Sequence, residues 1–275
     1  MFGRVSPGGC VMPRANLLHM SDFSERPGAA VVTGGSGGLG AAIARLLAVR
    51  GCDVAITYNR NVAAADRVLA DVAVHRRRGK AWQLALEDEQ ATRAFLGEVV
   101  AEFGGVHTVV HAAGPHVPQL HLSRVTPADF RRQLDQEVNA FFNLVHFVVP
   151  LLRATQGNLV AVTTVATRRY PVRDGLSAGT KGAVEAIVRA LAAEEGRFGV
   201  RMNCVGPGML TDGMAERLIG NGDLDERALE AARKNIAMRR FGRASDIAEA
   251  VCFLASDKAG YITGLMLDVD GGYHL

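Results

Sequence analysis

The sequence lacks the features that mark membrane, nucleic-acid-binding, metal-binding or disulfide-rich proteins. No apolar run reaches the roughly 18 residues that span a bilayer, and the first residues lack the apolar core of a signal peptide. The formal net charge is only +3, with basic residues scattered along the chain, which argues against nucleic acid as a partner. The four cysteines lie far apart, with neither metal-ligand spacing nor a disulfide pattern. We therefore expect a cytoplasmic protein that binds no metal, membrane or nucleic acid.

What is present is an alternation of short apolar runs and longer amphipathic runs. The chain has 275 residues, 48% of them hydrophobic, which suits one large α/β domain with a full core. We expect strands at 29–33, 53–58, 81–84, 106–113, 159–162, 200–205 and 262–272, and helices at 41–50, 67–78, 88–103, 126–152, 182–197 and 244–255. This alternation predicts a Rossmann-type doubly wound parallel sheet over residues 29–275, with ligands at the carboxyl ends of the strands. Residues 1–28 show no periodicity, and we interpret them as a mobile tail.

The first expected strand runs directly into a glycine-rich turn and then into a helix. In this context glycines permit a tight turn and let a pyrophosphate approach the backbone, while the helix N-terminus attracts the anion. The sequence therefore predicts a dinucleotide site at this turn. The residues that we expect to contact the dinucleotide here are Thr33, Gly34, Ser36, Gly38, Leu39 and Gly40.

The end of the second expected strand bears on the choice of cofactor. A carboxylate at this position would hold a ribose 2′-hydroxyl, whereas an arginine could accept a 2′-phosphate. The strand ends in Tyr58-Asn59-Arg60, without an acid. This pattern favours NADP(H), with Asn59 and Arg60 at the phosphate.

The segment from Thr163 to Lys181 carries the candidate chemistry. A hydroxyl, that of Thr164, stands at the end of an apolar strand, and Lys181 lies at the start of a helical run with Ser177 four residues before it. Positions i and i+4 share one face of a helix. Ser177 and Lys181 should therefore point into the same space.

Together these motifs resemble the short-chain dehydrogenase/reductases over residues 29–273. The glycine turn has the family spacing T-G-x-x-x-G-x-G, the active-site segment resembles the strand-end Ser followed by Tyr-x-x-x-Lys, and the chain closes on D-G-G. The resemblance implies that the NADP(H) site also includes Ala112, Ala113, Gly114, Lys181, Pro207, Gly208 and Thr211. It also implies a homo-dimer or homo-tetramer built through the long helices and the C-terminal strand, and a small-molecule substrate.

The resemblance further assigns roles within the catalytic site, with one residue missing. In the family, Ser polarises the substrate carbonyl, Tyr donates a proton, Lys lowers the pKa of that tyrosine and holds the ribose, and Asn completes a proton relay. Thr164, Lys181 and Asn139 match three of these positions. Ser177 stands where the tyrosine belongs. Because an alkyl hydroxyl is far less acidic than a phenol and shorter, it cannot replace a proton donor worth about 10²–10⁴ in rate.

We therefore expect an atypical reductase that acts on a carbonyl, an activated C=C bond or an imine with another proton donor. Some dienoyl-CoA reductases of the superfamily also have Ser four residues before the lysine, and S-A-G-T-K resembles their S-A-x-x-K. Their substitute tyrosine corresponds to Ala166 here. Tyr170 and His116 are the other candidates for the acid.

Two alternatives stay open at this stage. The fold could serve a non-redox reaction such as dehydration, cyclisation or isomerisation, or the chain could be a silent subunit of a hetero-oligomer with an active paralogue. Gly37 and Ala85 stand where NADP-dependent relatives often carry Arg and where relatives usually carry an adenine-contacting Asp. The polar run at 209–241 predicts a substrate lid, without a signature for any substrate.

Overall fold

The computed structural model describes residues 22–23, 25–212 and 226–275. Within them, parallel strands form one seven-stranded sheet in the order β3-β2-β1-β4-β5-β6-β7. The strands are β1 (Ala29–Thr33), β2 (Asp53–Tyr58), β3 (Gly79–Gln83), β4 (Val106–His111), β5 (Asn158–Val162), β6 (Arg201–Pro207) and β7 (Met266–Val269). The sheet is doubly wound, as expected, and its order reverses between β1 and β4, where ligands bind in such folds. Of the tail expected at 1–28, residues 1–21 and 24 lie outside the described part of the chain, whereas Phe23 is buried in the core on the α1 side of the sheet.

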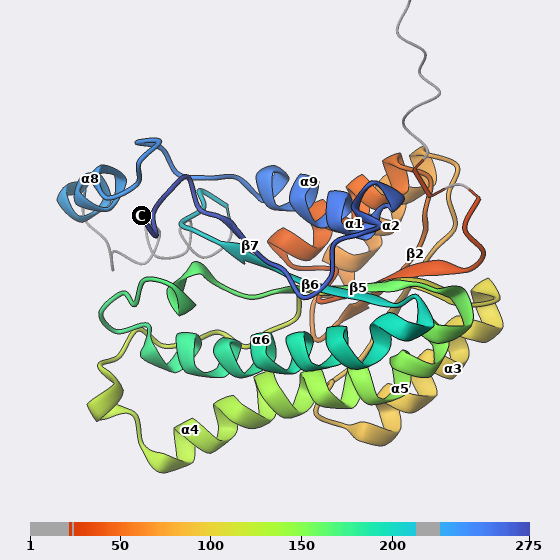
Figure 1. The fold of residues 1–275 in the computed structure, drawn as a ribbon, viewed down its shortest axis with the longest axis horizontal. Coiled ribbons are helices and arrows are strands. Elements are labelled where there is room, and N and C mark those ends of the chain that lie inside the picture. The colour runs from red at the N-terminus through yellow and green to blue at the C-terminus, as the bar shows by residue number, and fades with distance from the viewer. Residues whose placement is uncertain (1–21, 24, 213–225) are drawn as a thin grey trace, which may run out of the picture.

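Helices cover both faces of the sheet (Figure 1). One face carries α1 (Gly38–Val49), α2 (Val62–Val74) and α9 (Ala244–Ala255), and the other carries α3 (Glu89–Phe103), α5 (Ala140–Thr155) and α6 (Gly175–Glu195). The helix α4 (Pro127–Leu134) leads into α5, and α8 (Glu226–Lys234) lies near the C-terminus. This arrangement leaves the carboxyl edge of the strands to the connecting loops.

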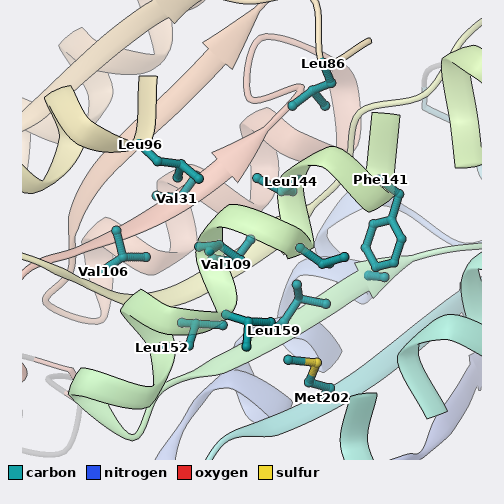
Figure 2. Packing of buried hydrophobic residues seen from close by; sticks show 14 of the residues in the cluster. Val31, Leu86, Leu96, Val106, Val109, Phe141, Leu144, Leu152, Leu159 and Met202 are labelled. Carbon is teal, nitrogen blue, oxygen red and sulfur yellow. The ribbon is translucent and has the colours of Figure 1, made fainter. Parts of the chain in front are cut away.

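Two apolar clusters, one on each face, hold the helices to the sheet. Figure 2 shows the cluster under α5, where Leu144 and Leu152 pack with Val109 of β4 and Leu159 of β5. All four side chains are fully buried. Burial of each is worth about 1.5–3 kcal/mol, so α5 and the central strands form a rigid base for the loops.

The single long helix expected at 126–152 is divided by a π-helical turn, η3 (Asp135–Asn139), between α4 and α5. A π-turn holds one extra residue in the helix and shifts the faces that follow it. By length and composition alone the run Pro127–Thr155 could cross a bilayer, but the buried side of α5 packs on the sheet. The turn changes which side chains of this run face the interior, with consequences for the site.

Helix α6 begins at Gly175, seven residues before the helix expected there. Ser177 and Lys181 therefore both lie inside it, on one face. After β6 the chain leaves the sheet, and Leu210 pairs with Gly242 in an isolated parallel bridge before α9 begins. Much of the expected lid at 209–241 falls in residues 213–225, outside the described part of the chain.

Candidate active site

The glycine turn after β1 is a close-fitting cradle of backbone. Gly34 has φ +68°, and a Cβ there would lie 2.8 Å from the carbonyl oxygen of Ala112. A Cβ on Gly40 would lie 2.3 Å from the carbonyl oxygen of Gly34. Only glycine fits both positions. The turn thus packs directly against the start of α1 and against the segment after β4.

The N-terminus of α1 is free to receive an anion. Its N-cap residue, Gly37, makes no side-chain hydrogen bond to the first turn, and that turn contains no acidic residue. The first backbone N–H groups of a helix lack internal partners and carry a partial positive charge. This helix end fits the pyrophosphate of a dinucleotide.

At the end of β2, Asn59 and Arg60 are both exposed, and the backbone carbonyl of Asn59 accepts a hydrogen bond from Gln83 on β3. No carboxylate stands at this strand end, so nothing there repels a phosphate. Ala85, two residues past β3, is also exposed and offers only a methyl group. Among the described residues, Arg60 thus forms no ion pair and the ends of β2 and β3 carry no acidic side chain at positions 59, 60 and 85.

Ser177 and Lys181 lie one turn apart on α6, and the segment after β4 passes beside Lys181. Ser177 is 7% exposed. The side chain of Lys181 is 16% exposed, and its Nζ atom lies 3.7 Å from the point where a Cβ on Gly114 would stand. Thr164 is half-buried at the end of β5, and its hydroxyl accepts a hydrogen bond from the backbone N–H of Ala166. Thr164, Ser177 and Lys181 thus lie at the carboxyl edge of the sheet.

The residue in contact with Lys181 is Glu137. The Nζ atom of Lys181 donates a hydrogen bond of 2.7 Å to Oε1 of this glutamate, which is 1% exposed within the π-turn η3. Asn139, which we expected beside the lysine, is exposed and donates to Asp135 at 2.7 Å. The structure contradicts the expected place of Asn139 because residues two apart in a helix point to different sides. Sequence reasoning missed Glu137.

His111, the last residue of β4, is buried and neutral. Burial lowers its pKa to about 3, and the nearby charge of Lys181 acts in the same direction. Its Nδ1 atom lies 3.0 Å from the hydroxyl of Thr33, and its ring packs against Phe141 with centroids 5.0 Å apart. It joins the ends of β1 and β4 as a structural residue.

One further carboxyl group lies near Lys181. Asp174 immediately precedes α6, and its Oδ1 accepts a 3.3 Å hydrogen bond from the side chain of Gln119. Burial raises the pKa of the Asp174 carboxyl above its ordinary range, although Gln119 and the charge of Lys181 oppose the shift. Sequence reasoning passed over this aspartate, although it stands one helical turn before Ser177.

The two proton donors suggested by the sequence are not brought to Lys181. Tyr170 is 73% exposed, and its neighbour Arg169 is tied outward by a hydrogen bond to the backbone carbonyl of Tyr273. His116 is exposed and lines a cavity of about 150 Å³ whose wall includes Leu176. Neither makes a hydrogen bond to a residue of the site within the described part of the chain.

Pro207 ends β6 and is buried, and the backbone N–H of Gly208 donates a hydrogen bond to the carbonyl of Val269 in β7. A Cβ on Gly208 would lie 2.6 Å from the Cα of Asp270. Thr211 is exposed and bonded to the carbonyl of Gly242. The turn is therefore held against β7, with Thr211 at the start of the expected lid.

Comparison with known proteins identifies this arrangement. The family model described as "Enoyl-(Acyl carrier protein) reductase" matches residues 34–274. The chain belongs to the short-chain dehydrogenase/reductase superfamily. It is 32% identical to the 3-oxoacyl-[acyl-carrier-protein] reductase FabG of Staphylococcus epidermidis, over 90% of this chain and 98% of that protein. It is also 32% identical to the L-fucose dehydrogenase of Oryctolagus cuniculus, over 89% and 84% of the two chains.

Solved structures of this superfamily share the fold across nearly their full length. A dehydrogenase/reductase from Sinorhizobium meliloti superposes with a TM-score of 0.84 and 29% identity, covering 94% of this chain and 99% of that one. A short-chain dehydrogenase from Burkholderia cenocepacia, solved in complex with NADP, gives 0.83 and 31%, covering 92% and 100%. The sequence resemblance to this superfamily of oxidoreductases, and the seven-stranded doubly wound sheet, are thus confirmed.

Proposed function

We propose that the protein is an NADP(H)-dependent reductase of a small organic carbonyl, activated C=C bond or imine, with a proton donor other than tyrosine. The observation that supports this most is the combination of a close-fitting cofactor cradle with Ser177 at the tyrosine position. Gly34 and Gly40 leave no room for a side chain, which keeps the turn tight and its backbone N–H groups close to the N-terminus of α1, where a pyrophosphate would bind.

The residues present fit the cofactor. The α1 N-terminus and the glycine turn would hold its pyrophosphate, Asn59 and Arg60 its 2′-phosphate, and Lys181 its nicotinamide ribose. Bound NADPH would supply a hydride. Thr164 would orient the acceptor atom of the substrate with its hydroxyl, and Ser177 would leave space above Lys181 for a larger substrate than a tyrosine allows.

For the proton donor, we propose Asp174. Asp174 is half-buried, burial raises the pKa of its carboxyl group, and the charge of Lys181 opposes that shift, so the group lies within electrostatic reach of the site. A carboxylic acid whose pKa moves toward neutral can serve as a general acid. An aspartate would also stabilise a cationic iminium substrate, which favours imines among the three substrate classes.

The decisive experiment is a titration of the purified protein with NADPH, followed by nicotinamide fluorescence. Saturable binding that is weaker for NADH supports the proposal. Absence of binding at millimolar NADPH would overturn it and favour the silent subunit. Binding of NADPH without its oxidation by any ketone, enone or imine would favour the non-redox alternative.

We also propose a homo-dimer or homo-tetramer built on the outer face of α5. Phe142 is 54% exposed on this helix, and its ring stacks on that of His146 with centroids 6.4 Å apart. An exposed aromatic pair of this kind is typical of interfaces. Light scattering of the Phe142→Glu variant should report a smaller assembly than wild type, whereas an unchanged mass would place the interface elsewhere.

A further inference from the structure

The feature from which we argue is the ion pair of Glu137 and Lys181. The two atoms that meet, Oε1 and Nζ, are 2.7 Å apart. The side chains are 2% and 16% exposed, respectively. Buried charges attract each other strongly when water is excluded, and such a pair holds both partners in place. Lys181 is therefore fixed in direction by a carboxylate from the helix beside its own.

The second oxygen of Glu137 is also buried, and it has no hydrogen-bond partner among the described residues. Gly114, just past β4, closes the space beside it. A Cβ at Gly114 would lie 3.3 Å from Oε2 of Glu137 and 3.7 Å from Nζ of Lys181. The carboxylate and the ammonium thus both lie next to Gly114 in the segment after β4, and the second carboxylate oxygen is shielded from bulk water.

Other titratable groups around Lys181 do not compensate its charge in this way. His111 of β4 is neutral above a pKa of about 3. The thiol of Cys204 on β6 is also neutral, because burial raises its pKa to about 12. Asp174 interacts with Lys181 without a hydrogen bond to it, since its bonded partner is Gln119. Glu137 alone among these groups contacts the ammonium.

We propose that Glu137 is a positioning residue that neutralises and directs Lys181, so that its carboxylate takes the place of a phenol at position 177 as the partner of the ammonium. A free ammonium lowers the pKa of a phenol beside it, because it stabilises the phenolate. A lysine already paired with a buried carboxylate has lost most of this effect. The ion pair therefore stands in place of the lysine–phenol pair, and a tyrosine put back at position 177 finds a lysine that cannot activate it.

The inference rests on the proposed function only in taking Lys181 as the cation of the site. It is tested with S177Y and the double variant S177Y/E137Q, with the wild-type spectrum, which contains the four native tyrosines, subtracted. The phenol of the introduced tyrosine is titrated by its ultraviolet absorbance, without cofactor or substrate. We expect its pKa to be lower in S177Y/E137Q than in S177Y by about one to two units. Equal pKa values in the two variants would overturn the proposal.

A matched control comes from Glu185, which is 3% exposed on the same helix as Lys181 and accepts its hydrogen bond from Thr167. The phenol pKa in S177Y/E185Q should equal that in S177Y. A shift as large as that of E137Q would mean that any buried carboxylate has this effect, and would contradict a specific role for Glu137. If E137Q unfolds, as judged by circular dichroism, E137N takes its place with the same expected shift.

A second measurement separates this inference from the proposed reductase function. Reduction of generic ketones by NADPH should be at least about tenfold faster with S177Y/E137Q than with S177Y, because the phenol becomes a better matched acid. If neither variant binds NADPH, the reductase proposal fails while the phenol titration still decides the role of Glu137. If both bind NADPH and the phenol pKa values are equal, the role of Glu137 fails alone.

Discussion

The hydroxyl of Thr33 and the Nδ1 atom of His111 lie 3.0 Å apart and tie the last residue of β1 to the last residue of β4. This link stands directly behind the glycine turn, at the point where the strand order reverses. The other ring nitrogen of His111 is buried without a partner among the described residues. A proton added to this nitrogen would have no hydrogen-bond acceptor, so the imidazole of His111 stays neutral in the folded protein.

The buried, neutral His111 makes the stability of the fold decrease in acid. The pKa of His111 is lowered to about 3 in the folded state, so below pH 6.5 the unfolded chain binds a proton that the folded chain does not. Between pH 6.5 and about 3, each further pH unit of acidification should then cost about 1.4 kcal/mol of stability through this residue. His111→Asn should remove the contribution of this residue to the pH dependence of unfolding, measured with urea at pH 7 and pH 5.

His107, also on β4, contributes a similar loss below pH 6.5, because burial lowers its pKa to about 4. The slope in His111→Asn should therefore fall without vanishing. His75 is exposed at the end of α2, and His75→Asn serves as the control that leaves the slope unchanged. A slope in His111→Asn equal to that of wild type would show that this histidine charges in the folded state.

Gly40→Ala should abolish NADPH binding. The new Cβ would lie 2.3 Å from the carbonyl oxygen of Gly34, so the turn must open. The N–H groups of the opened turn would no longer point toward the pyrophosphate. Gly97→Ala on α3 meets nothing within 4 Å and should bind NADPH as wild type does, with a gain in stability of up to about 1 kcal/mol. Fluorescence titration compares the two, and equal affinities would count against a cofactor at this turn.

Arg60→Ala should discriminate between the two nicotinamide cofactors. Loss of a charged hydrogen bond worth about 1.5–3 kcal/mol should weaken NADPH binding roughly 10- to 100-fold and leave NADH binding unchanged. Arg67→Ala, which removes another exposed charge from α2, should alter neither affinity. An equal loss for both cofactors would show that Arg60 supports the loop and does not read the phosphate.

Asp174→Asn should lower kcat by about 10²–10⁴ if this carboxyl group donates the proton. In the wild type, kcat should fall as the pH rises through the raised pKa of Asp174, because the acid is then lost, and the variant should lack this limb. Tyr170→Phe and His116→Ala should each retain activity, since neither side chain is brought to Lys181. A large loss in Tyr170→Phe, with Asp174→Asn active, would reverse the assignment.

The fold could be predicted from the sequence almost in full, because the parallel strands are continuous apolar runs separated by amphipathic ones. The bounds of β1 and β2 were predicted residue by residue. The long helix was the main difference. A π-turn is stabilised by tertiary packing and leaves no local composition signal, so the division of 126–152 into α4, η3 and α5 could not be seen.

The error at Asn139 has another cause, because the sequence did contain a signal for Glu137. Glu137, Phe141, Leu144 and Val148 recur at spacings of four, three and four, which is the stripe of one helix face. A carboxylate within an apolar stripe is rarely buried without a partner. Lys181 was the only partner already assigned to the site. Family resemblance drew attention to the asparagine two residues later, whose side chain points away.

The bridge between Leu210 and Gly242 joins the two ends of the segment that leaves the sheet after β6 and returns before α9. Because Leu210 and Gly242 are held together by backbone hydrogen bonds, we expect β6 and α9 to keep their relative positions when the residues between 210 and 242 change in length or composition. Loop-closure entropy grows only slowly with length, so insertions there cost little. Under the proposed function, this segment is therefore the part of the chain that can differ between relatives with different substrates while the sheet beneath it stays unchanged.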